Sequence, residues 1–136
     1  MNAKTEKKFK DLARFMQANH IISEFEGNKE RFASLSKSFL RALAEDLKMA
    51  CGVTDQKNVK VSFNRGGPAV AGDPALYIMG ENQGAAVYVT DTGGGKILFR
   101  SIRAMNDYAG GNNQWANFND GFERLYENIK ELVSRA

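Results

Sequence analysis

Polar and aromatic residues gather between residues 97 and 122, in the segment that joins the last expected strand to the last expected helix. They are Arg100, Arg103, Asp107, Tyr108, Gly110, Gly111, Asn112, Asn113, Gln114 and Trp115. An arginine that projects from a sheet can hold an anionic group, an aromatic ring offers a stacking surface, and an asparagine amide can form two hydrogen bonds to a base edge. This set of side chains is typical of recognition of a nucleotide or nucleobase.

A structural interpretation of the same segment stays open. Asparagine and glycine tolerate left-handed backbone, Asp107 can cap a turn, and Trp115 can fill the core above the last helix. Side chains alternate along a strand, so Arg100 and Ile102 are expected on one face of the last strand and Arg103 on the other. Only one of these two arginines can therefore have its side chain on the core-facing side of the strand.

The connection from residue 64 to residue 74, with the sequence NRGGPAVAGDP, is longer than most hairpins require. Its adjacent glycines, Gly66 and Gly67, would let the backbone approach a ligand, and Arg65 could hold an anionic group. The alternative is a flexible excursion at the edge of the sheet. If this connection and the 104–117 loop lie at the same end of the sheet, they frame one cleft. The candidate ligand-binding residues are Arg65, Arg100, Arg103, Asp107, Tyr108, Asn112, Asn113 and Trp115.

Familiar catalytic and metal-binding patterns are missing from the sequence. The chain has one cysteine, Cys51, and one histidine, His20, which cannot form an internal disulfide or a zinc site of the usual type. The segment DTGGGK at 91–96 lacks the spacing of a phosphate-binding loop and precedes a strand rather than a helix. No group of aspartates has the spacing of a calcium loop. We expect no catalytic residue, no metal and no cofactor.

The composition is that of an ordinary globular domain. Of the 136 residues, 43% are hydrophobic and 26% are charged, and the length suits a single domain over 1–136. There is no apolar run of about 18 residues, and the N-terminal sequence lacks the hydrophobic core of a signal peptide. We therefore expect a cytoplasmic protein that does not contact a membrane.

The formal net charge is +3, and the basic excess lies in the N-terminal half of the chain. Four lysines crowd the start of the first expected helix and could contact nucleic-acid phosphates. They are Lys4, Lys7, Lys8 and Lys10. A solvated helix face is the alternative, and a charge of this size also fits simple solubility. The same short helix could instead pack on a second copy of the chain and form a homodimer.

Hydrophobic spacing predicts three helices. Apolar residues at positions 9, 12, 13 and 16 predict a helix over 4–19, and the same spacing continues through a longer helix over 28–50. The third helix is assigned to 117–134 and begins near residue 119 or 120, where DGFE has the D-x-x-E capping pattern. Phe118 opens its apolar stripe.

From Asn58 the hydrophobic period changes from about 3.6 residues to 2, which predicts a strand. Three more strands are expected over 75–79, 85–90 and 96–103, with short glycine-bearing segments between them that are typical of hairpin turns. No helical pattern separates the strands, so they should pair antiparallel. The expected fold is α+β. A helical part over 1–52 precedes a four-stranded antiparallel meander over 58–103, which two N-terminal helices and one C-terminal helix cover.

The segment from Leu98 to Asn113, in which LFR is followed by DYAGGNN, resembles a loop in small uncharacterised proteins of bacteriophages and other mobile elements. It covers under a fifth of the chain, and that family has no activity to carry over. The resemblance implies one functional class: phage-encoded proteins that block a host defence by binding a component or by sequestering a signal nucleotide.

We expect a non-enzymatic binding protein that recognises a small polar, nucleotide-like ligand or a protein surface through the strand-to-helix loop. The alternative is a protein-interaction module, such as an inhibitor of a host nuclease or defence complex, that acts through the sheet edge and the basic helix. An enzyme of unfamiliar type ranks third, because no constellation centred on a histidine or a nucleophile is present.

Overall fold

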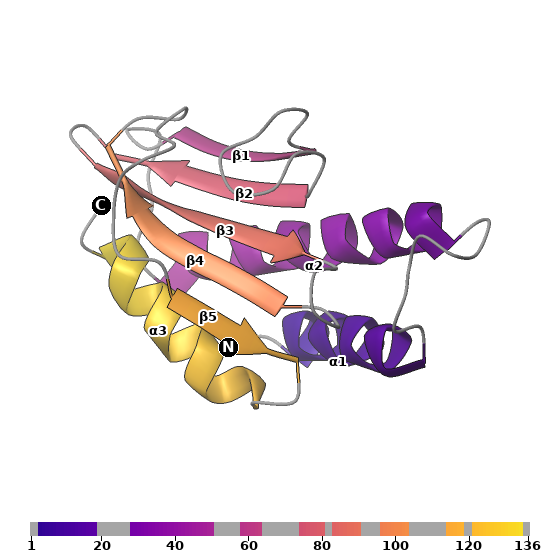
Figure 1. The fold of residues 1–136 in the computed structure, drawn as a ribbon. Coiled ribbons are helices and arrows are strands. Elements are labelled where there is room, and N and C mark those ends of the chain that lie inside the picture. The colour runs from indigo at the N-terminus through magenta and orange to yellow at the C-terminus, as the bar shows by residue number, and fades with distance from the viewer. Residues whose placement is uncertain are drawn as a thin grey trace.

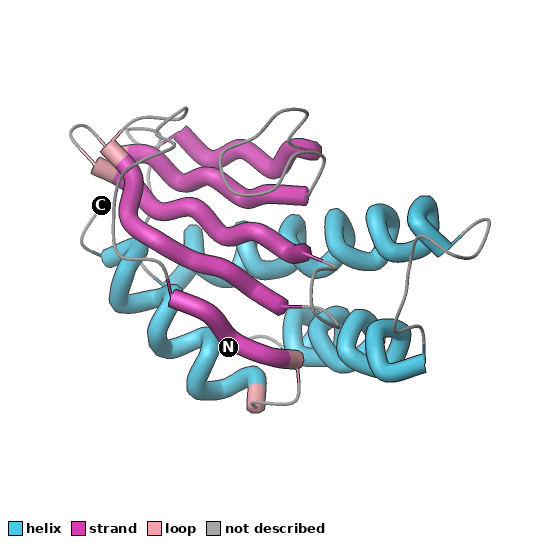
Figure 2. Tube along the Cα trace, viewed as in Figure 1, coloured by secondary structure: helices cyan, strands magenta, loops and turns pink. Residues whose placement is uncertain are grey.

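The computed structural model describes residues 3–18, 28–50, 58–63, 74–80, 83–90, 96–103, 114–118 and 121–134. In chain order the elements are α1 (Ala3–Ala18), α2 (Asn28–Ala50), β1 (Asn58–Phe63), β2 (Pro74–Met79), β3 (Gly84–Thr90), β4 (Lys96–Ile102), β5 (Gln114–Asn117) and α3 (Phe122–Ser134) (Figure 1). The three helices lie against one face of the antiparallel sheet (Figure 2). The expected α+β fold, with its meander and its two N-terminal helices and one C-terminal helix, is confirmed.

The sheet follows the chain strand by strand. Its order is β1-β2-β3-β4-β5, and every neighbouring pair is antiparallel. The β2–β3 hairpin is closed by a hydrogen bond of 2.9 Å that the Gly80 amide donates to the Gln83 carbonyl. Across the middle of the sheet Tyr77 pairs with Ala86, and Ala86 pairs with Arg100. These three side chains therefore stand in one row on the same face.

The first two helices form an antiparallel pair. Near its start, α1 presents Thr5, whose hydroxyl donates a 3.3 Å hydrogen bond to the carbonyl of Ala42 in the second half of α2. The end of α1 and the start of α2 meet where Phe15 and Leu35 line a shared hollow. Thr5 is 1% exposed, so this bond holds the two helices together from inside their contact.

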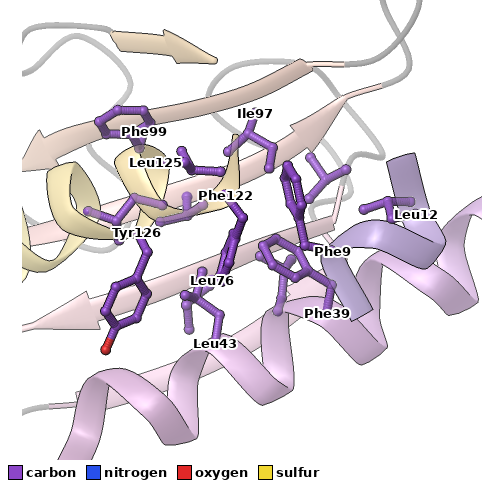
Figure 3. Packing of buried hydrophobic residues seen from close by; sticks show 14 of the residues in the cluster. Phe9, Leu12, Phe39, Leu43, Leu76, Ile97, Phe99, Phe122, Leu125 and Tyr126 are labelled. Carbon is purple, nitrogen blue, oxygen red and sulfur yellow. The ribbon is translucent and has the colours of Figure 1, made fainter. Parts of the chain in front are cut away.

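Aromatic rings from separate elements form the centre of the core (Figure 3). The Phe9 ring of α1 lies 5.8 Å from the Phe39 ring of α2, 5.7 Å from the Phe118 ring and 5.0 Å from the Phe122 ring of α3, measured between centroids. Such tilted pairs add to the stabilisation from area burial alone. The apolar stripes of all three helices thus converge on one cluster, where Phe99 of the sheet also lies.

The three central strands are buried on both faces. One face of β2, β3 and β4 belongs to the cluster under the helices, and the opposite face forms a second buried cluster. The second cluster contains Ala75, Tyr77, Ala86, Tyr88, Leu98 and Ile102. Continuous apolar runs such as AAVYV in β3, rather than strict alternation, are typical of strands with two buried faces.

The segment before the last helix differs from the sequence prediction. Residues Gln114–Asn117 form a fifth strand that pairs with β4, and α3 begins at Phe122 instead of within 117–120. Residues 119 and 120, the expected start of the helix, lie outside the described residues. Phe118 is buried, but it sits in a turn after β5 rather than on the helix. A strand of four residues is too short to show a period, which is why the sequence pattern missed it.

Candidate functional site

Arg100 lies near the end of β4 and is 4% exposed. It shares its face of the sheet with Leu98 and Ile102, which is the side turned away from the helices. Strand alternation predicted that Arg100 and Ile102 would lie together, and the structure agrees. Arg103, one residue beyond the strand, is exposed, so the two arginines differ in environment as expected.

Two tyrosines accompany Arg100 on this face. The guanidinium carbon of Arg100 lies 6.0 Å from the centre of the Tyr88 ring, a cation–π contact. The Tyr77 and Tyr88 rings meet edge to face, with their centroids 6.0 Å apart and an interplanar angle of 83°. Ala86 stands in the row between Tyr77 and Arg100, and its small side chain leaves room for these large neighbours.

The surroundings of Tyr88 keep its hydroxyl protonated. Burial raises the pKa of Tyr88 well above its ordinary value of about 10, because the phenolate would lose its hydration. Tyr77 raises the pKa further, while the Arg100 guanidinium opposes both effects. The phenol is therefore a neutral hydrogen-bonding group at any physiological pH.

Trp115 lies on β5, the last strand in the order of the described sheet, and is 54% exposed. Its backbone pairs with Leu98, and the Lys96 ammonium lies 5.8 Å from the centre of its ring. The alternative that Trp115 fills the core above the last helix is wrong, because more than half of the side chain faces solvent. The indole is instead a stacking surface with a cation at one side.

A groove runs between β5 and α3 on the helix side of the sheet. Trp115 is one of its lining residues, although its side chain stands on the opposite face with that of Leu98. We call it the tryptophan groove; its residues are Phe99, Gln114, Trp115, Ala116, Gly121, Arg124, Leu125 and Asn128. Its volume of about 670 Å³ is within the usual range for a small-molecule site. The buried side chains of Phe99 and Leu125 give it an apolar floor, and exposed polar side chains stand around the rim.

The polar rim comes from two elements. Gln114 pairs with Phe99 across the β4–β5 ladder, so its amide stands on the helix side of the sheet. Arg124 and Asn128 are four residues apart on α3 and lie on one side of that helix. The groove thus offers a guanidinium and two amides over an apolar floor. The Trp115 indole stands on the other face of β5, beside Lys96.

The candidate residues from the sequence are only partly brought together. Trp115 lies in the tryptophan groove, Arg100 is buried in the tyrosine cluster, and Arg103 is exposed just after β4. The other five lie outside the described residues: Arg65, Asp107, Tyr108, Asn112 and Asn113. The proposed neighbourhood of the 64–74 and 104–117 connections is therefore also outside the described part.

Sequence reasoning missed Arg124 and Asn128. They flank Leu125 on the helix, and their spacing of four residues was the available signal. That signal is weak by itself, because most exposed helix faces carry polar residues at this spacing. Arg124 and Asn128 become part of a groove only because α3 lies beside β5.

The four lysines at the N-terminus divide between two surfaces of α1. Lys4 and Lys8 line a hollow against α2, whereas Lys10 forms a 3.2 Å ion pair with Glu6 on another side of the helix. Lys7 is exposed and lines none of the hollows described here. The basic N-terminus is therefore not one uniform surface.

Comparison with protein families, with curated proteins and with solved structures finds no match to this chain. In the parts of the chain that the structure describes, no three histidine, cysteine, aspartate or glutamate side chains gather as a metal site would require. No helix within those parts has both the length and the apolarity needed to cross a bilayer.

Proposed function

We propose that the chain is a binding protein, and that the tryptophan groove takes a small polar, nucleotide-like ligand. The lining of the groove carries this proposal. Three polar side chains surround the apolar floor of Phe99 and Leu125, which suits a ligand with an apolar face and polar edges. The sequence prediction placed Trp115 in a ligand-binding segment, but its indole stands on the opposite face of β5.

The other side chains of the groove supply the complementary chemistry. Arg124 can hold a phosphate or carboxylate in a bidentate manner, and the Gln114 and Asn128 amides can recognise a base edge. None of these groups is a nucleophile or a general base, which supports binding rather than catalysis.

Thermal denaturation with a panel of nucleotides and nucleosides tests the proposal. A compound that occupies the groove should raise the melting temperature with a saturable dependence on its concentration. Arg124→Ala should weaken this binding at least about tenfold, the value of one lost charge-assisted interaction.

Two controls sharpen the experiment. Arg31→Ala removes an exposed arginine on α2 that is not part of the groove, so it should leave the titration unchanged. Trp115→Ala should leave the thermal shift unchanged, because the indole stands on the opposite face of β5, and the protein should stay folded since the indole is mostly exposed. Absence of any thermal shift across the panel would refute the proposal of a nucleotide-like ligand.

A protein partner is the second candidate, and the position of β5 favours it. β5 is the last strand in the described sheet order and carries exposed side chains at three of its four positions. Such an edge can accept a strand from another chain, either a second copy or a different protein. An inhibitor of a host nuclease or defence complex would be one protein of this kind.

Affinity capture from a bacterial lysate with wild-type and Trp115→Ala baits separates the two candidates. Loss of a captured protein in the variant, with no effect of added nucleotides, would support the protein-binding alternative. Self-association by sedimentation that Trp115→Ala removes would indicate a homodimer through β5, which differs from the dimer through the first helix that the sequence predicts. Neither result is expected if the groove serves only a small ligand.

A further inference from the structure

A second groove lies between α1 and α2 and has a marked positive charge. Its residues are Lys4, Thr5, Lys8, Ser34, Lys37, Ser38, Arg41, Ala42 and Glu45, and its volume is about 470 Å³. We call it the basic groove. Four cationic side chains line it against one carboxylate, and none of its residues belongs to the tryptophan groove. We propose that this groove binds the phosphate backbone of a nucleic acid.

Helical spacing arranges the four cations in two pairs, one on each helix. Lys4 and Lys8 are four residues apart on α1, and Lys37 and Arg41 are four residues apart on α2. Each pair therefore spans about 6 Å along its helix axis. Because the helices are antiparallel and in contact, the two pairs stand on opposite walls of one channel. This spacing is comparable to that of neighbouring phosphates along a nucleic-acid strand.

A hydrogen bond between α1 and α2 forms the floor of the groove. Thr5 is 1% exposed and donates its hydroxyl hydrogen to the Ala42 carbonyl, at the place where the cationic walls face each other. Glu45, the single carboxylate of the lining, forms a 3.4 Å ion pair with Lys48. That ion pair reduces the ability of Glu45 to neutralise the cations of the groove.

Gathering four like charges has an energetic cost. Like charges at i and i+4 destabilise a helix, and here two such pairs also face one another across a groove. The apolar core forms on the other sides of these helices, so packing does not demand the cluster. A bound anion would offset the repulsion, and the number of cations suits several phosphates rather than one.

The chemistry of the lining favours phosphates over an acidic polypeptide. Besides the cations, the groove offers the hydroxyls of Ser34 and Ser38, and lysine, arginine and serine are common donors to nucleic-acid phosphates. Protein interfaces instead centre on aromatic and aliphatic anchors. Ala42 is the only apolar residue of this lining, and no aromatic ring is present to stack on a base. Binding should therefore be independent of base sequence.

The chain itself supplies a matched control on the same helix. Lys8 lines the basic groove. Lys10 lies outside the groove and forms a 3.2 Å ion pair with Glu6, and Lys7 is exposed and also lies outside the groove. Replacing any of them with glutamine removes one positive charge and leaves a residue of similar helix propensity. If the groove binds the nucleic acid, replacement of Lys8 should lower the affinity more than replacement of Lys7 or Lys10. If only the net charge matters, all three replacements should lower the affinity equally.

Fluorescence anisotropy with a labelled, mixed-sequence DNA duplex tests the proposal in the full chain. Wild-type protein should bind at low ionic strength, and the logarithm of the affinity should fall linearly with the logarithm of the salt concentration. Lys8→Gln and Arg41→Gln should each weaken binding at least about threefold and reduce the salt slope by about one. Lys7→Gln and Lys10→Gln should change the affinity less than about twofold.

Three results would overturn the proposal. They are no binding of the duplex at low salt, equal losses in the groove variants and in the Lys7 and Lys10 variants, and displacement of the duplex by poly-glutamate at equal charge concentration. The second result would assign binding to net charge, and the third would point to an acidic polypeptide as the partner. Melting curves monitored by circular dichroism confirm that each variant is folded.

Discussion

At the scale of single residues, Tyr88 predicts how stability responds to high pH. Burial raises its pKa in the folded state above the ordinary value of about 10 that it has when unfolded. The folded state then holds the proton more tightly, so its contribution to stability is complete below about pH 10. Above that pH the unfolded chain ionises first, and the contribution falls as pH rises, by at most about 1.4 kcal/mol per pH unit.

Tyr88→Phe should remove this part of the pH dependence. The free energy of unfolding, measured with urea between about pH 8 and about pH 11, should fall less steeply with pH in the variant than in the wild type. At neutral pH the variant loses only the interactions of the hydroxyl with the neighbouring Arg100 and Tyr77 side chains. Equal slopes in the two proteins would mean that Tyr88 titrates freely in the folded state.

At the scale of elements, sequence periodicity located most of the fold. The expected helix over 28–50 has the same bounds in the structure. The first expected strand begins at Asn58 as predicted, and the other three agree to within one residue at each end. These elements are long or strongly apolar, so their period survives tertiary packing. β5 was missed because its four residues make no period, and its pairing with β4 depends on contacts from outside the segment.

Gly84, the first residue of β3, fixes how closely β2 and β3 approach. A Cβ atom at this position would meet the Ile78 carbonyl oxygen and would lie 2.9 Å from the Met79 Cα, both of them backbone atoms that cannot move aside alone. Gly84→Ala should therefore lower the free energy of unfolding by about 1–3 kcal/mol. Urea denaturation at neutral pH measures the change.

Gly121, which precedes α3, is the matched control for this substitution. A Cβ there would meet no atom within 4 Å, so Gly121→Ala should lose no more than the preference for glycine over alanine at a helix N-cap, about 1 kcal/mol at most. If both variants lose the same stability, a general cost of replacing glycine explains the result, and the close approach of β2 and β3 does not.

At the scale of the whole molecule, neither groove could have been derived from the sequence alone. Arg124 and Asn128 join Gln114 in the tryptophan groove only because β5 lies beside α3. Likewise Lys4 and Lys8 were noticed, whereas Lys37 and Arg41 lie some thirty residues further along the chain. Residue types indicate which chemistry is available, but the pairing of distant elements decides which side chains act together.

The division of the basic residues between surfaces makes a last prediction, about the stability of the whole chain without any ligand. Lys8 stands among like charges in the basic groove, whereas Lys10 pairs with Glu6, which precedes it by one helical turn in the favourable order. At low salt Lys8→Gln should raise the free energy of unfolding by a few tenths of a kcal/mol. Lys10→Gln should lower it by about 0.3–0.5 kcal/mol.

Both effects should fade at about 0.5 M NaCl, because exposed charges are then screened. Unfolding by urea, which adds no ions, measures the change in free energy of unfolding for each variant relative to the wild type at both salt concentrations. The two variants are comparable because both replace a lysine of α1 with glutamine. Opposite signs at low salt would show that the groove concentrates unfavourable charge, which an anion is needed to offset. A loss of stability in both variants would mean that Lys8 is already neutralised within the fold, and the basic groove would then lose its electrostatic reason to bind phosphates.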